Sequence, residues 1–509
     1  MGRISCRRST AVVLALGLAL GATRVEAQTW RMEPSISLTE TLTNNVNLSA
    51  SSDRQGDLIS QLTPTLKFSE IGARSKLDGT IALPVVLYAR TGSENNNVYP
   101  TANVLGTVAA VERFLFIEGF VSVSQPFLSP FGAQPSGLTS ATDNRYTQST
   151  YRVSPYIKGE SPGSVEFELR NNSSWTNLNG APINTSNSYT SEWLGKVQGP
   201  AAPLRWFGDF DFVDVNFQNQ APQRTNLARG GLRYLVSPQF RVQLAAGYED
   251  NHYPFSDFRG AIYGGGIEWR PTERTSVSAN VEHRFFGTSY LLSIAHRTPL
   301  SVWSVAASRN ITTYPQQLGT LTPGANVQGL LDQLLSSRIP DPAQRQQAVQ
   351  DLIQQTGLPS TVSGPVNVYS EEILLAENFN ATVGLTGARN DLFLNVFRLR
   401  NEPITASGTA LPSLLDANNN NTQLGANLTW THRLTPMAAL NLTAFVSRTT
   451  ANAPLTGRTN QGGALLQLSS PLSAHTTATA GIRFQKLNSD IVQSYTEAAV
   501  LAGLTYSFK

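Results

Sequence analysis

The sequence predicts an all-β protein: a transmembrane, up-and-down antiparallel β-barrel of about 22 strands, within a range of roughly 18 to 24. Three observations predict this fold. Apolar residues alternate with small or polar ones in short segments along most of the chain, which is the pattern of strands with one apolar face. Turn residues recur at intervals that fit pairs of such strands. Charged residues make up only 14% of the chain, against roughly 25% in ordinary soluble proteins.

Residues 1–27 have the pattern of a secretory signal peptide. A basic segment, the apolar run AVVLALGLAL and small residues before Gln28 follow one another in the expected order. The pair Arg7 and Arg8 leaves a twin-arginine signal as the alternative, but no further residue of that motif follows. We therefore expect cleavage near Ala27, with residues 28–509 forming a barrel in the outer membrane of a Gram-negative bacterium.

Cysteine content and charge exclude several classes of function. The single cysteine, Cys6, lies in the signal peptide, so thiolate metal centres are not expected in the mature chain. Removal of residues 1–27 leaves 34 basic and 34 acidic side chains. No basic run follows that could track a phosphate backbone. We expect no cofactor and no nucleic-acid partner, whereas outer-membrane lipid and the barrel-assembly machinery are expected partners.

Alternation alone would also fit a water-soluble β-sandwich. Aromatic residues at the ends of the apolar faces favour the barrel, because membrane barrels carry aromatic girdles at both interfaces. These residues are Tyr248, Trp269, Phe285, Trp430, Phe484, Tyr506 and Phe508.

Turn chemistry predicts the strand number. Proline is excluded from central strands and belongs at turns. Five tight turns are expected near prolines and five more near other residues, and ten such turns between eleven hairpins give about 22 strands with both ends in the periplasm. The turns are expected near Pro238, Pro271, Pro299, Pro436 and Pro471, and near Gly72, Glu112, Gly163, Ala202 and Ala388.

The opposite connections are expected to be long, solvated loops such as TGSENNN, NNSSWTNLNG and LDANNNN. One of them contains a helical insert, residues 325–360. Apolar residues at helical spacing, including Leu331 and Val349, predict two short helices there. The insert is expected either to cap the extracellular mouth as a lid or to form a purely structural mini-core.

The last strand carries an expected assembly signal. Gly503, Tyr506 and Phe508 resemble the terminal pattern by which outer-membrane barrels are recognised for insertion. Two departures are Lys509 after the final aromatic and Leu501 where a polar residue is usual.

Two regions of the chain resemble a known family. PSISLTETLTNNVNL, the following GDLISQLTPTLKFSEIGARSKLDG, and DPAQRQQAVQDLIQQTGLP are similar to segments of the outer-membrane barrel family associated with PEP-CTERM/exosortase systems. The resemblance covers roughly residues 30–80 and 335–360. It implies a cell-envelope role near exopolysaccharide export or surface-protein sorting, with exopolysaccharide or its export proteins as partners, and it brings no catalytic residues.

Seven charged residues are expected to line the lumen, because they fall on the small or polar face of their strands. They could set the selectivity of a pore or only brace the wall by pairing. The residues are Arg233, Arg241, Glu249, Glu268, Glu282, Arg284 and Arg483.

The five histidines show no metal-ligand or nucleophile spacing. The sequence therefore predicts a protein that is not an enzyme. A porin-like or export-associated conduit is the leading hypothesis for its function. The alternative is a non-conducting structural or adhesive surface barrel, and an outer-membrane lipid hydrolase is a minor one.

Overall fold

The computed structural model describes most of residues 29–508, and the expected signal peptide lies outside the described residues. Much of the expected insert, including residues 350–360, also lies outside them. The ranges not described within 29–508 are 160–162, 164, 181–186, 219, 255, 321–328, 330, 333–334, 337–338, 340–343, 346–347, 350–363, 368 and 405–416.

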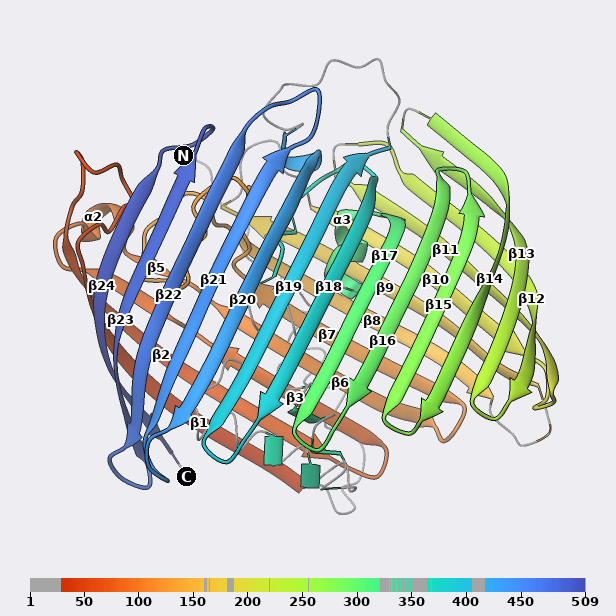
Figure 1. The fold of residues 1–509 in the computed structure, drawn as a ribbon, viewed down its shortest axis with the longest axis horizontal. Helices are drawn as coiled ribbons and strands as arrows, with labels where there is room; N and C mark the ends of the chain where they lie inside the picture. Colours follow the sequence, from red (N-terminus) through yellow and green to blue (C-terminus); the bar gives the residue numbers. More distant parts are fainter. Residues whose placement is uncertain are drawn as a thin grey trace.

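The described residues form one closed antiparallel sheet (Figure 1). Its strands are β1 (Thr29–Thr43), β2 (Asp57–Ile71), β3 (Ser75–Ala82), β4 (Val85–Tyr88), β5 (Asn97–Val98), β6 (Thr101–Val111), β7 (Leu115–Ser124), β8 (Thr147–Gly159), β9 (Glu166–Asn179), β10 (Ser188–Gln198), β11 (Leu204–Phe217), β12 (Gln223–Ser237), β13 (Phe240–Tyr253), β14 (Ser256–Thr272), β15 (Thr275–Arg284), β16 (Gly287–Arg297), β17 (Ser301–Thr312), β18 (Leu374–Thr386), β19 (Asn390–Pro403), β20 (Asn421–Arg433), β21 (Ala439–Ala451), β22 (Arg458–Pro471), β23 (Thr476–Ser489) and β24 (Tyr495–Ser507). Two short helices are α2 (Gly92–Asn95) and α3 (Tyr314–Thr320).

The wall has 22 strands, as the sequence predicted. β2 pairs with β3 and then with β4, and these two segments pair in turn with β6 and β5. β3 and β4 therefore form one wall strand, and β5 and β6 form the next one. This reduces the 24 segments to 22 wall strands. β1 pairs antiparallel with β24, from Ser35 opposite Ser507 to Thr43 opposite Ala499, and this pairing closes the barrel.

The predicted tight turns fall at or next to connections between consecutive strands at one end of the barrel, for example Gly72–Arg74 between β2 and β3 and Gly387–Arg389 between β18 and β19. Pro271 and Pro471 belong to the ends of β14 and β22, and the connection at Gly163 is described only in part. The start of β1 and the end of β24 lie at the same end. We call this the turn end and the opposite one the loop end. In a bacterial barrel the turn end faces the periplasm and the loop end the cell exterior.

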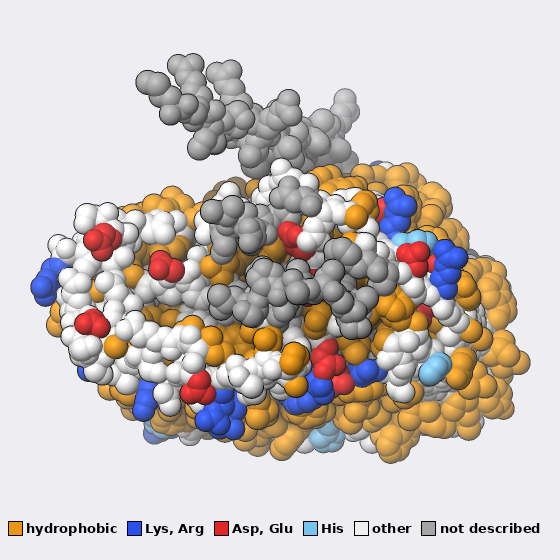
Figure 2. Space-filling model, turned by 90° about the horizontal axis from the view of Figure 1, so that it is seen from above, with side chains coloured by type: hydrophobic (Ala, Val, Ile, Leu, Met, Phe, Trp, Pro, Cys, Tyr) orange, Lys and Arg blue, Asp and Glu red, His pale blue; other side chains and the backbone are white. Residues whose placement is uncertain are grey.

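The outer wall is apolar, as a strand wall in lipid requires. Leu244 on β13 is 71% exposed and Val446 on β21 is 62% exposed in the isolated chain. The sequence neighbours of Leu244 are Gln243 and Ala245, which are polar or small and face the lumen, so alternation separates a lipid face from a lumen face. Figure 2 shows hydrophobic side chains around the outside of the wall. Among the described residues, no helix is long and apolar enough to cross a bilayer.

One segment expected to be a loop is instead a strand. Residues 171–179 of NNSSWTNLNG belong to β9. Asn172 faces the lumen and donates to Glu192 at 2.7 Å, while Trp175 is 43% exposed on the outer wall. Asparagine and serine are tolerated here because one strand face meets a polar lumen and the other lies near the membrane interface.

Candidate functional site: a charged chamber and its boundaries

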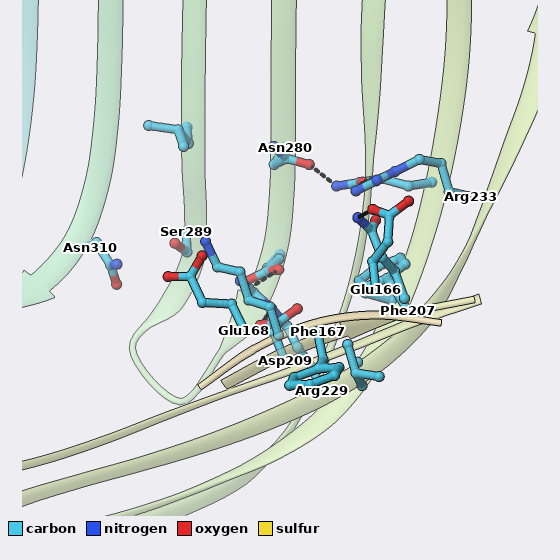
Figure 3. A pocket seen from close by; sticks show the side chains of 18 of the residues that line it. Glu166, Phe167, Glu168, Phe207, Asp209, Arg229, Arg233, Asn280, Ser289 and Asn310 are labelled. Atoms are coloured by element: carbon cyan, nitrogen blue, oxygen red, sulfur yellow. Dashed lines mark hydrogen bonds and ion pairs between the residues drawn. The ribbon is translucent and has the colours of Figure 1, made fainter. Parts of the chain in front are cut away.

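The lumen contains a chamber of about 520 Å³ against the inner wall of β8–β17 (Figure 3). Antiparallel register places its charged residues on one face, because residues directly opposite each other point the same way. Thus Lys196 on β10 lies opposite Asp209 on β11, and Asp209 lies opposite Arg229 on β12. Four basic and four acidic side chains line the chamber: Lys158, Lys196, Arg229 and Arg233, with Glu166, Glu168, Asp209 and Glu282.

Arg229 is the central cation of the chamber. Its Nε lies 2.6 Å from Asp209 Oδ2, and its Nη1 also bonds Glu282, three strands away. A guanidinium suits this position because its planar fork can serve two carboxylates at once. Glu166 near the turn end is held by Arg205 at 2.8 Å and by Gln198 at 2.8 Å. Most chamber charges are therefore fixed in pairs.

Arg233 and Gln243 form a polar row beside this cluster. Arg233 Nη2 donates to Gln243 Oε1 at 3.1 Å, and Gln243 donates onward to Asn280. The guanidinium of Arg233 also lies 5.3 Å from the ring centre of Phe207. Amide, guanidinium and aromatic groups side by side can hold a polar solute by hydrogen bonding and by ring contact.

A buried ion pair bounds the chamber toward the loop end. Arg284 Nη2 lies 2.6 Å from Glu249 Oε2, and both side chains are almost fully buried. Arg284 Nη1 donates to Asn310, which lines the chamber, at 2.7 Å. The Phe285 backbone nitrogen donates to Glu249 at 3.0 Å. The pair thus fixes the β15–β16 turn against the wall.

All seven residues predicted to face the lumen lie on the inner face by register, but only some share the chamber. Arg233 and Glu282 line it, and Glu249 and Arg284 bound it. Arg241 and Glu268 form a half-exposed pair at 3.5 Å near the turn end. Arg483 lies on the other side of the barrel, on β23. Sequence reasoning missed Arg229 and Asp209, although Arg229 is four residues before Arg233 on β12 and therefore lies on the same face of the strand.

Arg483 instead holds a loop that folds into the lumen. Its Nη2 pairs with Glu497 at 2.6 Å and donates to Ser140 at 3.1 Å, and its Nη1 donates to Thr139 at 3.0 Å. These two residues belong to the β7–β8 connection, residues 125–146. Phe131 in the same connection is 2% exposed. The expectation that the outer loops are solvated is wrong for this connection, because its polar groups are satisfied by the inner wall.

Aromatic residues near the loop end join this connection to the next one. Tyr146 and Tyr314 share a 2.6 Å hydrogen bond between their hydroxyls, and Tyr314 also donates to Gln148. Burial raises the pKa of both tyrosines above the ordinary value, so both stay neutral. Tyr369 packs edge-on against Tyr314, with ring centres 5.2 Å apart. The inward loop and α3 are thereby tied together within the barrel.

The described parts of the insert extend to the opposite end from the one expected. Gly329, Leu331 and Asp332 are helical, and so are Gln344, Arg345 and Val349. Arg345 Nε bonds Asp332 at 2.7 Å, which joins the two helical pieces. Arg297, at the turn end of β16, donates to Ser336. Figure 1 draws these pieces at the lower end, beside the tight turns. The expectation that the insert caps the extracellular mouth is therefore wrong for these described residues.

The terminal pattern lies at the seam that closes the barrel. Tyr506 on β24 lies opposite Ile36 on β1 and is 43% exposed on the outer wall. The Phe508 backbone nitrogen donates to Pro34 at 2.9 Å. A Cβ on Gly503 would lie 2.8 Å from Thr479 Oγ1. A side chain there would crowd the seam.

The histidines are dispersed in the described structure. His252 lies 3.7 Å from Asp250 on the outer wall, while His296 bonds Thr275 and His432 bonds Asn390 near the turn end. No group of three or more His, Cys, Asp or Glu residues in the described part of the chain could hold a metal ion.

A closed wall with an apolar exterior and a charged, water-accessible chamber inside defines an outer-membrane β-barrel of the porin-like class. No protein-family model matches this chain, and no curated protein sequence matches it.

Three solved structures are similar in fold to this chain. The siderophore receptor PirA from Acinetobacter baumannii is 10% identical, with 95% of this chain and 81% of that one covered and a TM-score of 0.47. The FrpB iron transporter from Neisseria meningitidis is 7% identical, with 94% and 82% covered and a TM-score of 0.49. OccK2 from Pseudomonas aeruginosa is 7% identical, with 94% and 98% covered and a TM-score of 0.36. Because the sequence identities and TM-scores are this low, the assignment to the class of porin-like barrels rests on the geometry of this chain.

Proposed function

We propose that this protein is a porin-like conduit through which small polar solutes cross the outer membrane by way of the charged chamber. One observation carries the proposal: a chamber of about 520 Å³ lies inside a closed barrel and is lined by four cations and four carboxylates. A wall that only had to close the lumen would be filled by packed side chains. Exposed charges facing an internal cavity favour passage of solute and water instead.

The balance of charge favours neutral or zwitterionic solutes. The paired cations and carboxylates at Arg229, Asp209 and Glu282 give crossed local fields and little net charge. Phe207 and Asn280 add a ring face and an amide to the lining. Small sugars and their derivatives have the matching combination of hydroxyl groups and apolar ring faces.

The conduit is tested by reconstituting the refolded chain in a planar bilayer and in liposomes. We expect single-channel currents, and swelling of the liposomes in neutral sugars up to a size limit. The matched variant Gln243→Trp fills the chamber without adding charge, and it should lower both readouts. Heat-modifiable barrels that neither conduct nor swell would overturn the proposal.

A second candidate is a non-conducting structural or adhesive barrel. One observation favours it: residues 125–146 and Tyr314 fill part of the lumen with buried contacts. Absence of current together with normal surface display would support this function.

The finer role is proposed from sequence resemblance alone. Similarity to the PEP-CTERM/exosortase-associated barrels supports a place near exopolysaccharide export, with exopolysaccharide or its export proteins as partners. Insertion would depend on the barrel-assembly machinery. Pull-down of the tagged barrel from cells that secrete polysaccharide, with a barrel of unrelated sequence as control, tests the partnership.

A further inference from the structure

Three cations gather on the outer wall at the loop end of β21–β23. Arg448 lies opposite Leu424 and Asn460, which places it on the lipid face, because Leu424 is 49% exposed there. Lys486 lies opposite Gly462, which in turn lies opposite the exposed Val446. Arg458 begins β22. All three side chains are exposed, and we call them the basic triangle.

The basic triangle lacks acidic partners. Arg448 Nε donates to the neutral Asn460 at 2.8 Å. Among the described residues, neither Arg458 nor Lys486 makes an ion pair. The acidic residue Asp490 is near in the chain, but its contact with Arg458 is a backbone one, from its nitrogen to the Arg458 oxygen at 3.0 Å. Figure 2 shows Lys and Arg side chains along the edge of the wall.

Cations elsewhere on the outer wall at the same end are arranged differently. Arg224 pairs with Asp214 at 3.0 Å, and Arg259 pairs with Asp250 at 2.8 Å. Both pairs face outward, as their register with the exposed Phe212 and Tyr248 shows. The chain therefore compensates outward cations with its own carboxylates at two places and leaves those of the basic triangle to an external anion.

An apolar groove of about 690 Å³ lies next to the basic triangle, beginning at Phe484 and extending toward the turn end. Small residues make it: Ala464 and Ala498 lie opposite Phe484 on either side. The larger lining side chains are Leu42, Leu466, Ile482 and Val500. Phe484 is two residues from Lys486 on the same face of β23. The groove crosses β22, β23, β24 and β1, within the belt that contacts hydrocarbon.

We propose that the basic triangle and this groove together bind the phosphorylated glycolipid of the outer leaflet, with headgroup phosphates on Arg448, Arg458 and Lys486 and one acyl chain in the groove. The loop end faces the cell exterior, so the leaflet at this height is the one that holds phosphorylated glycolipid. Arginine and lysine bind phosphate oxygens by charge-assisted hydrogen bonds. Arg448 and Lys486 are two strands apart, or about 10 Å, which fits a headgroup with more than one phosphate.

The test is native mass spectrometry of the detergent-solubilised full chain with lipid A bearing two, one or no phosphates. The variant R448Q/R458Q/K486Q should bind the diphosphorylated lipid about 100-fold more weakly, since each cation near an anionic membrane surface contributes about fivefold. Lys486→Gln alone should lose about fivefold. The matched control R224Q/R259Q removes two outward cations that have carboxylate partners and should leave the affinity unchanged.

The groove is tested separately by A464L/A498L, which fills it with side chains that suit lipid. This variant should weaken binding about tenfold, equivalent to about two methylene groups left unburied. A gel shift on boiling checks that each variant is folded. The proposal is overturned if the triple variant binds diphosphorylated lipid A like the original chain, or if phosphatidylglycerol binds equally well.

Discussion

The Thr43 hydroxyl donates a 2.8 Å hydrogen bond to the Glu497 carboxylate across the seam between the first and last strands. The same carboxylate accepts from Arg483 at 2.6 Å, and Arg483 reaches Thr139 and Ser140 of the inward loop. One buried carboxylate therefore joins barrel closure to the position of a lumenal loop.

Glu497→Gln should destabilise the barrel and free the inward loop. Removing one partner leaves a buried cation without a counter-charge, which costs about 3–5 kcal/mol. The temperature at which the gel mobility shifts should fall, and conductance should rise or become noisy. Glu268→Gln is the control, because its exposed pair with Arg241 contributes about 1 kcal/mol or less. Equal shifts in the two variants would contradict the role of the buried pair.

Single substitutions in the chamber should change ion selectivity in opposite directions. Arg229→Gln leaves the lining with excess negative charge and should favour cations, whereas Glu282→Gln should favour anions. Reversal potentials in a salt gradient across a planar bilayer measure both. The double variant restores the balance of charge, so its reversal potential should return close to zero. If neither single variant moves the reversal potential, ions do not pass the chamber.

Deletion of Tyr506–Lys509 should lower the amount of assembled barrel much more than the amount of transcript. The deletion removes the outward Tyr506 and the Phe508 backbone bond to Pro34 at the closing seam. Gly503→Val tests the same seam by crowding Thr479. Ser507→Ala serves as the control for a change that leaves the backbone intact. Normal insertion after the deletion would show that the terminal aromatics carry no assembly signal.

The protein should fractionate with the outer membrane and run at a different gel position before and after boiling. A closed barrel with every strand edge paired resists detergent until heated. Recovery from the soluble periplasm would be incompatible with the exposed apolar wall around Leu244 and Val446.

Deletion of residues 325–360 tests the insert. The side chains of Leu331 and Val349 are fully buried, and Ser336 is bonded to Arg297 at the turn end. If this segment restricts passage, currents should grow while the barrel stays heat-modifiable. Unchanged currents with a lower melting temperature would identify a structural mini-core instead.

Local patterns in the sequence were sufficient to predict the strands of the barrel wall. Alternation of Val242, Leu244 and Ala246 with polar or small neighbours predicts which face meets lipid, and turn residues such as Pro299 predict strand number. The same alternation of faces along a strand placed Arg233 and Glu282 on the inner face. Such rules work because a strand needs only its own residues to define its two faces.

Contacts between distant segments could not be predicted in the same way. Residues 125–146 have no alternation that separates an inward loop from a solvated one, and the contact of Ser140 with Arg483 spans more than half the chain. The β9 residues Asn171–Asn179 were expected to be a loop because their polar composition hid the strand period. Their partners in β8 and β10 settle their conformation.

The pairing of β1 with β24 also imposes an order of events on biogenesis. The hydrogen-bonding edge of β1 finds its partner only in the last strand, so ribosome, translocon and periplasmic chaperones must release the whole polypeptide before the sheet can be completed. Until then a long, open edge is available for pairing with another chain. A prematurely terminated product would thus be a hazard for aggregation and a substrate for periplasmic proteases, and quality control need only sense whether the final strand has arrived.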